Sequence, residues 1–220
     1  MGDKRIGSIQ QALTDLGYNS GKVDGEFGPN TKAALTALIA AGGLPASHPS
    51  VSATPPWVAE MLRRKGLHEV NDKTTLVQWL RSDGKTLGDP SKLPWCADAV
   101  QTAIALTLPG ETLPASLRQN PYWAKNWADF GAPCTLQVGA VVVFSREGGG
   151  GHVGFLLGRD PSTGYLVVLG GNQKNSISIA PMNPKNLIGA RWPLSYPAPG
   201  RPTLPALSAT GKPLESGEMA

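Results

Sequence analysis

The chain has 220 residues, a formal net charge of +4 and an isoelectric point near 9.1. Its 40% hydrophobic and 16% charged residues are typical of a globular protein. No apolar run approaches the ~18 residues of a membrane-spanning helix, and the basic residues are scattered rather than gathered into one stripe. The composition therefore predicts a monomer that neither inserts into membranes nor binds nucleic acid.

The N-terminal sequence, MGDKRIGSIQQALTDLG, has none of the common targeting signals. It lacks the apolar segment of a secretory signal peptide, and Ile6 stands where N-myristoylation requires Ser or Thr. We therefore expect the protein to be made in a cytoplasm without a signal peptide. A reducing cytoplasm disfavours a disulfide between the two cysteines, Cys96 and Cys134.

Residues 1–43 have the pattern of a small helical module. Apolar residues recur at helical spacing between positions 6 and 16, and Gly17 follows as a C-cap. Turn-forming Gly, Asn and Asp residues then fill 18–28. A second helical pattern begins near Pro29 and ends at two glycines. A unit of this size has a small core and usually serves as an attached module.

Two stretches rich in Pro, Ser and Ala, 44–55 and 198–220, predict a linker and a disordered tail. Between them, residues 56–197 begin with amphipathic helical patterns and continue with short Val-, Leu- and Ile-rich runs. Helices followed by strands predict an α+β domain with an antiparallel sheet. We expect helices within 55–66, 74–84 and 94–106, and strands within 139–147, 152–160, 164–172 and 175–182.

The stretch LPWCADAV places Cys96 between a tryptophan and an apolar helical run. Pro94 is suited to open the helix. Cys96 would then lie in the first turn, where the helix dipole stabilises a thiolate. Cysteine is also among the most frequently buried residues. Taken alone, this stretch allows Cys96 to be a core residue, half of a disulfide, a metal ligand or a nucleophile.

A cysteine nucleophile requires a base, normally histidine, and the chain has three histidines. His48 falls in the predicted linker, and His68 falls at a helix end. His152 follows four glycines and begins a predicted strand, where a glycine run lets backbone and substrate approach closely. His152 is therefore the preferred partner of Cys96.

A third side chain must orient the imidazole through its other nitrogen. Asn172 ends the strand that follows His152, and adjacent antiparallel strands bring such positions side by side. Its amide oxygen can accept the imidazole N–H. Asn175 and Asp98 are alternatives, and Asp98 ranks lower because it points ~200° around the helix from Cys96.

Motifs for metals and cofactors are lacking in the sequence. It has no CxxC pair, no HExxH, no calcium loop and no phosphate-binding loop. A zinc site built on the two cysteines and His152 has no specified fourth ligand. Nothing selects a pair of carboxylates for sugar hydrolysis from Glu60, Glu69 and Glu111. We therefore expect no metal and no cofactor.

The N-terminal stretch IQQALTDLGYNSGKVDGEFGPNTKAALTALI resembles peptidoglycan-binding domains of the small three-helix type. The signature of that family is matched position by position by Val23, Asp24, Gly25, Phe27, Gly28 and Thr31. The resemblance implies that bacterial peptidoglycan is the partner of this module. It places Asp24, Gly25 and Phe27 near the bound glycan or stem peptide.

Residues 56–193 resemble CHAP-like cysteine peptidases of phage and bacterial cell-wall lysis proteins. LPWCADAV, SREGGGGHVGFLLG, LVVLGGNQ and IGARWP follow one another in that family's order. The resemblance implies a papain-like fold with Cys96 as nucleophile, His152 as base and Asn172 as the residue that orients the imidazole. We further expect Trp95 to wall the substrate cleft and the Cys96 backbone N–H to stabilise the oxyanion.

Together the two resemblances predict a modular endolysin that cleaves peptide or amide bonds of peptidoglycan. An endopeptidase is favoured over an N-acetylmuramoyl-L-alanine amidase. The protein would reach the wall through holin-type release, lysis or injection. Two alternatives stay open: a wall-degrading toxin passed between bacteria with the same triad, and a non-catalytic wall-binding or virion structural protein.

Overall fold

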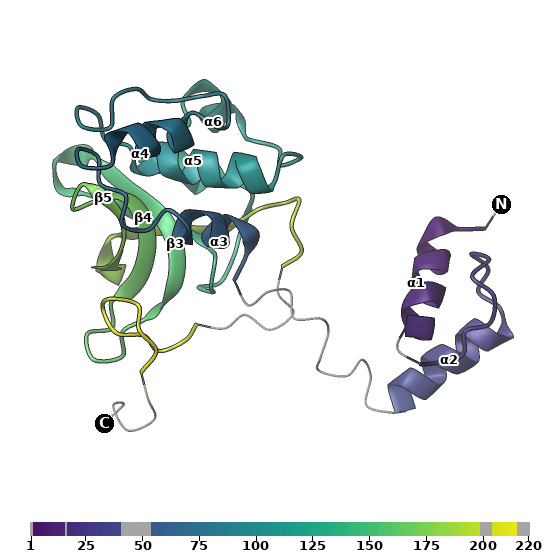
Figure 1. The fold of residues 1–220 in the computed structure, drawn as a ribbon. Coiled ribbons are helices and arrows are strands. Elements are labelled where there is room, and N and C mark those ends of the chain that lie inside the picture. Colours follow the sequence, from purple (N-terminus) through teal and green to yellow (C-terminus); the bar gives the residue numbers. More distant parts are fainter. Residues whose placement is uncertain (1, 16, 41–53, 199–203, 215–220) are drawn as a thin grey trace. The chain divides into compact units, whose positions relative to one another are not determined.

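The computed structural model describes residues 2–15, 17–40, 54–198 and 204–214 (Figure 1). The chain divides into two compact units, Met1–Val51 and Ser52–Ala220. Most of the expected linker, 44–55, lies outside the described residues, and His48 lies there with it.

The described part of the first unit contains two helices, α1 (Lys4–Asp15) and α2 (Pro29–Ala40). The three-helix resemblance implied one more. Gly17 follows α1 with a φ of 84°, a left-handed conformation that suits a C-cap glycine. The apolar core between the helices is small and consists of Leu13, Ala34 and Leu38.

A buried glutamine, Gln10, holds the segment that joins the two helices. Its Nε2 donates to Oδ1 of Asp24, the carbonyl of Glu26 and Oγ1 of Thr31, over distances between 2.9 and 3.0 Å. Its Oε1 accepts the backbone N–H groups of Asp24 and Gly25. One side chain therefore satisfies polar groups throughout the joining segment, in a unit whose apolar core is small.

The second unit is an α+β domain, as the sequence predicts. Its helices are α3 (Pro56–Leu62), α4 (Lys73–Leu80), α5 (Cys96–Thr107) and α6 (Ala115–Gln119), with 3-10 helices η1 (Ala124–Asp129), η2 (Glu147–Gly149) and η3 (Pro184–Asn186). Its strands are β1 (Ala132–Pro133), β2 (Val141–Ser145), β3 (Gly151–Arg159), β4 (Leu166–Gln173), β5 (Ser176–Met182) and β6 (Leu187–Trp192). The sequence did not predict α6, β1 and β6.

The strands form one antiparallel sheet in the order β1-β6-β2-β3-β4-β5. Four of them, β2 to β5, follow one another as a meander, which agrees with the expected spacing. β6 then returns to the other edge of β2, where it pairs Val141 with Arg191. This return makes β2 an interior strand, while β5 stays at the edge of the sheet.

Both faces of the central strands β2, β3 and β4 are buried. α5 packs on β3 and β4, and α3 packs on α5 (Figure 1). Alternate residues of β2 point to opposite faces: Val141 and Val143 join the core under the helices, whereas Val142 and Phe144 join a second core on the far side. Burial on both faces explains why the strands are nearly continuous apolar runs rather than alternating ones.

Residues 204–214 pack on the sheet, although the sequence predicted a disordered tail there. The N–H of Arg159 donates to the carbonyl of Pro205, and the N–H of Leu207 donates to the carbonyl of Arg159, both at 2.9 Å. Leu207 is buried beside Gly158, where an added Cβ would come within 2.6 Å of its Cδ1. The prediction of disorder was wrong for this segment, because its composition did not reveal a leucine that the sheet buries.

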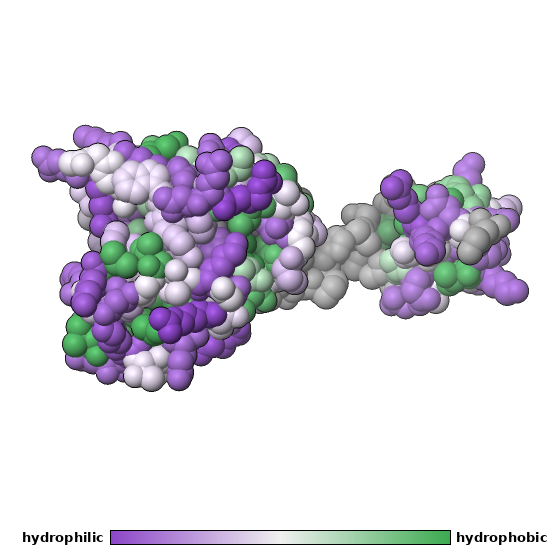
Figure 2. All heavy atoms as spheres, turned by 90° about the horizontal axis from the view of Figure 1, so that it is seen from above, coloured by the Kyte–Doolittle hydropathy of each residue, from purple (hydrophilic) through white to green (hydrophobic). Residues whose placement is uncertain are grey.

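The surface of the molecule is mixed in character. Figure 2 shows mostly hydrophilic residues, with hydrophobic residues between them. On the first unit, Val23 and Phe27 are about half exposed, at 48% and 51%. No helix within the described ranges has the length and apolar character needed to cross a membrane.

Candidate functional site

Cys96 is the first residue of α5, so its sulfur lies at the helix N-terminus as expected. The helix is pressed against β4 at Gly171, where an added Cβ would lie 2.6 Å from the Trp95 ring and 2.7 Å from Cβ of Ala99. This close approach brings the start of α5 down onto the strands. As a result, only 5% of Cys96 is exposed.

His152 lies near the start of β3, across from Phe144 of β2. Its ring is fully buried, and Nδ1 lies 3.1 Å from Nη2 of Arg146. A guanidinium group only donates hydrogen bonds, so this contact assigns Nδ1 as the acceptor and puts the ring proton on Nε2. Burial, reinforced by the Arg146 charge, lowers the pKa of His152 to about 3, against the opposing effect of the Gln173 amide.

Gln173, not Asn172, approaches the His152 ring. A β-bulge shifts the register of β4 and β5 between Gly170 and Gln173, and Asn172 has a φ of 54°. A bulge adds one residue and so changes which side chains point inward. An added Cβ at Gly170 would lie 3.2 Å from Nε2 of His152 and 3.1 Å from Nε2 of Gln173, so both groups flank that glycine.

The Gln173 amide is held in one orientation by three carbonyl groups. Its Nε2 donates to the carbonyls of Val168, Gly170 and Ser178 at 3.3, 3.1 and 2.6 Å. Its Oε1 and Nε2 of His152 are both buried without a hydrogen-bond partner among the described residues. A small shift would let the ring N–H donate to Oε1. Gln173 is thus placed for the role expected of Asn172, whose own role stays a prediction from the resemblance.

His152 and Gln173 flank Gly170, and the Cys96 thiol lies by the backbone of Val153, near the point where β3 and β4 cease to pair. The ladder between these strands runs from Arg159–Leu166 to Phe155–Leu169 and is not continued. Burial raises the pKa of Cys96, while the backbone of Val153 and the charge of Arg146 oppose the rise. No hydrogen bond joins Sγ of Cys96 to the His152 ring among the described residues. The resting site therefore contains a neutral thiol and a neutral imidazole.

Trp95 is buried, with 1% of its surface exposed, so it does not wall an open cleft as expected. Its Nε1 donates to Oε2 of Glu69 at 2.8 Å. Glu69 is itself anchored, because its backbone N–H donates to the carbonyl of Asn175 in the turn between β4 and β5. Glu69 thus ties Trp95, the residue before Cys96, to the end of the sheet, a role that sequence analysis missed.

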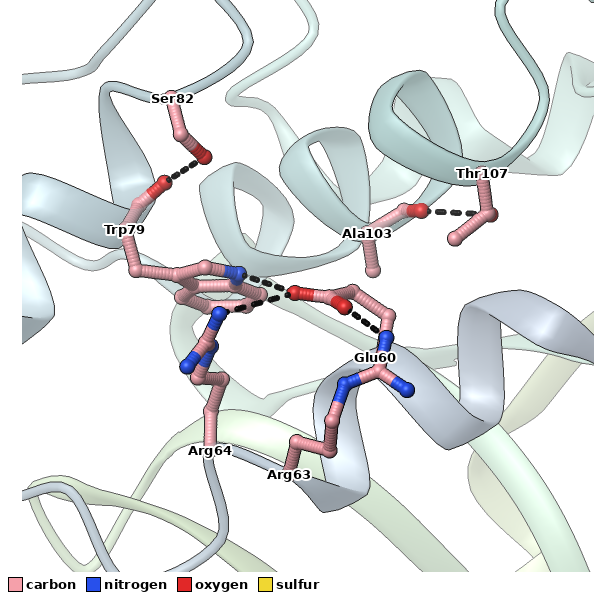
Figure 3. Close-up of polar contacts among 7 residues, drawn as sticks. All are labelled: Glu60, Arg63, Arg64, Trp79, Ser82, Ala103 and Thr107. Carbon is pink, nitrogen blue, oxygen red and sulfur yellow. Dashed lines mark hydrogen bonds and ion pairs between the residues drawn. The ribbon is translucent and has the colours of Figure 1, made fainter.

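The second buried carboxylate, Glu60, has a similar structural role (Figure 3). Its Oε1 accepts the indole N–H of Trp79 at 2.9 Å, and its carboxylate also pairs with Arg63 and Arg64. Burial acts to raise the pKa of Glu60, but the hydrogen bonds from Arg63 and Trp79 outweigh it and lower the pKa below its usual value. The carboxylate therefore links α3 to α4 through its hydrogen bond with Trp79.

Glu111 is likewise engaged, because it accepts the backbone N–H groups of Leu194 and Ser195 at 2.9 and 2.8 Å. Each of the three glutamates considered for sugar hydrolysis thus has partners of its own. Asp98 accepts the backbone N–H of Leu87 at 3.0 Å, and burial raises its pKa to about 6. None of these carboxylates is bonded to His152.

The other described histidine, His68, and the other cysteine, Cys134, lie outside the site. His68 Nδ1 accepts the backbone N–H groups of Val70 and Asn71 and so caps a turn. Cys134 and Cys96 are both free thiols, and burial raises the pKa of Cys134 to about 11. Within the described ranges, no three His, Cys, Asp or Glu side chains are arranged to hold a metal ion.

The residues expected at the ligand site of the first unit differ in exposure. Gly25 is buried and donates to Gln10, and the Asp24 carboxylate accepts from Gln10 and from the backbone of Glu26. Gly25 therefore lies inside the turn, whereas Asp24 lies on its surface with Oδ1 in hydrogen bonds. The side chains of Asp24 and Phe27 are both exposed, so both are accessible to a ligand.

Comparison with known families identifies this unit. Residues 2–47 match the family model described as "Putative peptidoglycan binding domain". The N-terminal unit is a peptidoglycan-binding domain. The match includes the Gln10 network and Phe27, so these features belong to a domain that associates with the bacterial wall. No curated protein matches the chain.

Proposed function

We propose that the C-terminal domain hydrolyses peptide or amide bonds of peptidoglycan, with Cys96 as nucleophile, while the N-terminal domain holds the enzyme on the wall. The proposal is supported by one observation: the Cys96 thiol, at the start of α5, lies beside the backbone of Val153, the residue that follows His152 on β3, in a chain that carries a peptidoglycan-binding domain. Tethering raises the local substrate concentration without any new contact in the active site.

In this mechanism His152 removes the thiol proton and Cys96 attacks the carbonyl carbon of the scissile bond. The imidazolium then protonates the leaving amine, and water hydrolyses the acyl-enzyme with His152 as base. Gln173 is the positioning residue that accepts the ring N–H. The backbone N–H of Cys96 at the helix start is placed to stabilise the oxyanion. An endopeptidase is favoured, with an N-acetylmuramoyl-L-alanine amidase as the alternative.

The resting pKa values favour a second candidate, a wall-binding protein without catalysis. Burial raises the pKa of Cys96 and lowers that of His152, so both effects oppose a thiolate–imidazolium pair. A buried structural cysteine reacts slowly with thiol-specific electrophiles, whereas a cysteine activated by histidine reacts fast. Catalysis by Cys96 therefore requires that substrate binding lower the pKa of Cys96 and raise the pKa of His152.

The test compares Cys96→Ala with Cys134→Ala in the full chain. We expect Cys96→Ala to abolish the loss of turbidity of purified cell walls and to leave wall binding intact. Cys134→Ala, which removes the other free thiol, should keep both activities. Lysis by Cys96→Ala would overturn the mechanism, and absence of lysis by the wild type would favour the non-catalytic candidate. Mass spectrometry of the released fragments distinguishes an endopeptidase from an amidase.

A further inference from the structure

Arg146 is the charged residue nearest the reacting groups of the proposed mechanism. Its Nη2 lies 3.1 Å from Nδ1 of His152, and its charge acts on both His152 and Cys96. Arg146 has no role in the mechanism expected from the sequence. The hydrogen bond occupies the lone pair of Nδ1, and the proton on Nε2 leaves that nitrogen unable to accept. In the resting state, neither nitrogen of His152 is therefore able to take the proton of Cys96.

The same residue is free to move. Arg146 is exposed, and it precedes η2, in which Gly148 and Gly149 have φ values of 77° and 87°. Its backbone N–H closes this turn by donating to the carbonyl of Gly150 at 3.0 Å. The turn is held by the main chain, so the Arg146 side chain can change its rotamer without disturbing the turn.

The guanidinium also lacks an acidic partner. No salt bridge within the described parts of the chain involves Arg146, and its one side-chain hydrogen bond is to His152. Guanidinium offers five N–H donors in a fork that fits a carboxylate. An exposed, unpaired arginine beside the candidate nucleophile is therefore suited to bind a carboxylate that arrives with the substrate.

We propose that Arg146 has two positions: at rest it donates to Nδ1 of His152, and with substrate bound it turns to a carboxylate of the peptide. This inference rests on the proposed function. Release of Nδ1 lets the proton of Cys96 pass to His152, which gives a thiolate and an imidazolium, so substrate binding switches on the nucleophile. The substrate class is a wall peptide with a free carboxylate close to the scissile bond.

The test uses the full chain and two synthetic stem peptides that differ only in whether the glutamyl α-carboxylate is free or amidated. We expect the wild type to have a kcat/KM about 10- to 100-fold higher for the free carboxylate, the range of a charge-assisted hydrogen bond. Arg146→Met should lose this preference, and Arg146→Lys should retain part of it. Arg159→Met, which removes an exposed arginine at the far end of β3, is the matched control and should keep the preference.

Nitrogen NMR of the His152 ring tests the resting contact without turnover. In the wild type we expect the proton on Nε2, with Nδ1 as acceptor, and in Arg146→Met we expect the pKa of His152 to rise. A proton on Nδ1 in the wild type, or an unchanged peptide preference in Arg146→Met, would overturn the inference. If the wild type neither cleaves the peptides nor lyses walls, the proposed function is overturned. The proposed contact between Arg146 and a substrate carboxylate is then overturned with it, whereas the resting contact with His152 is still tested by NMR.

Discussion

The two units of this chain are stabilised in different ways. Among the described residues, the peptidoglycan-binding domain has an apolar core of Leu13, Ala34 and Leu38 with Tyr18 and Leu35 packed against it, and the amide of Gln10 bonds to groups throughout the segment between its helices. The C-terminal domain buries both faces of the central strands of a six-stranded sheet. The peptidoglycan-binding domain therefore depends on polar contacts, whereas the C-terminal domain depends on close packing of apolar surfaces.

The largest expected effect is on the smaller unit. Gln10→Ala removes the partner of two buried groups, Oγ1 of Thr31 and the N–H of Gly25, at about 1–3 kcal/mol each, and a unit of about 40 residues has little stability in reserve. We expect this unit to unfold and wall binding to be lost in a cosedimentation assay. The thermal transition of the C-terminal domain should not change.

Gln11→Ala is the matched control for this change, because Gln11 is exposed and bonds to Asp15 alone. It should bind walls like the wild type. Retention of binding by Gln10→Ala would contradict the view that the polar network stabilises this unit.

The next effect concerns the packing of α5 on β4. Gly171→Ala would place a Cβ 2.6 Å from the Trp95 ring. Overpacking of this kind costs about 1–3 kcal/mol, and it would also displace the start of α5, where Cys96 lies. We expect a lower melting temperature and a larger loss of lytic activity than stability alone explains. Gly189→Ala in β6, where an added Cβ meets nothing within 4 Å, should be close to neutral.

The last effect, a gain in stability rather than a loss, tests an exception to apolar packing in the second unit. Asp98 is buried with Oδ1 unpaired, and its pKa is raised from 3.8 to about 6. The folded state therefore takes up the proton at a higher pH than the unfolded state, so this residue makes the domain more stable as the pH falls from about 6 to 4. The ionised form at pH 7 costs on the order of 2–3 kcal/mol.

Asp98→Asn removes that charge and keeps an acceptor for the Leu87 N–H. Chemical denaturation at pH 7 should show a gain in stability, and the gain should vanish near pH 4. A gain of equal size at both pH values would assign the effect to packing rather than to ionisation.

The sequence predicted the elements that determine the overall fold. Helical periodicity placed α1 to α5, and the position of Cys96 at the start of α5 followed from Pro94. The apolar runs of β2 to β5 were long enough to recognise as strands. β1 has two residues, and β6 has no strong apolar pattern, because its side chains are only partly buried. Such strands are defined by pairing with distant residues, which local composition does not reveal.

The site was predictable in part. His152 was found because glycines precede it on a recognisable strand. Gln173 was missed because Asn172 was chosen as the end of the strand that follows His152, and nothing in the sequence shows the bulge between Gly170 and Gln173 that brings Gln173 toward the ring. Glu69 and Arg146 were missed for a different reason: each acts through a contact with one residue, and no spacing rule links them to their partners.

The packing of Leu207 on Gly158 determines where the chain can be truncated or fused to another protein. The hydrogen bonds of Arg159 with Pro205 and Leu207 form an isolated parallel bridge between Arg159, at the end of β3, and Ala206. A shortened form ending at residue 198 would uncover Gly158 and leave a hollow on the sheet. A fusion partner or affinity tag is therefore better attached after residue 214 than at the end of β6.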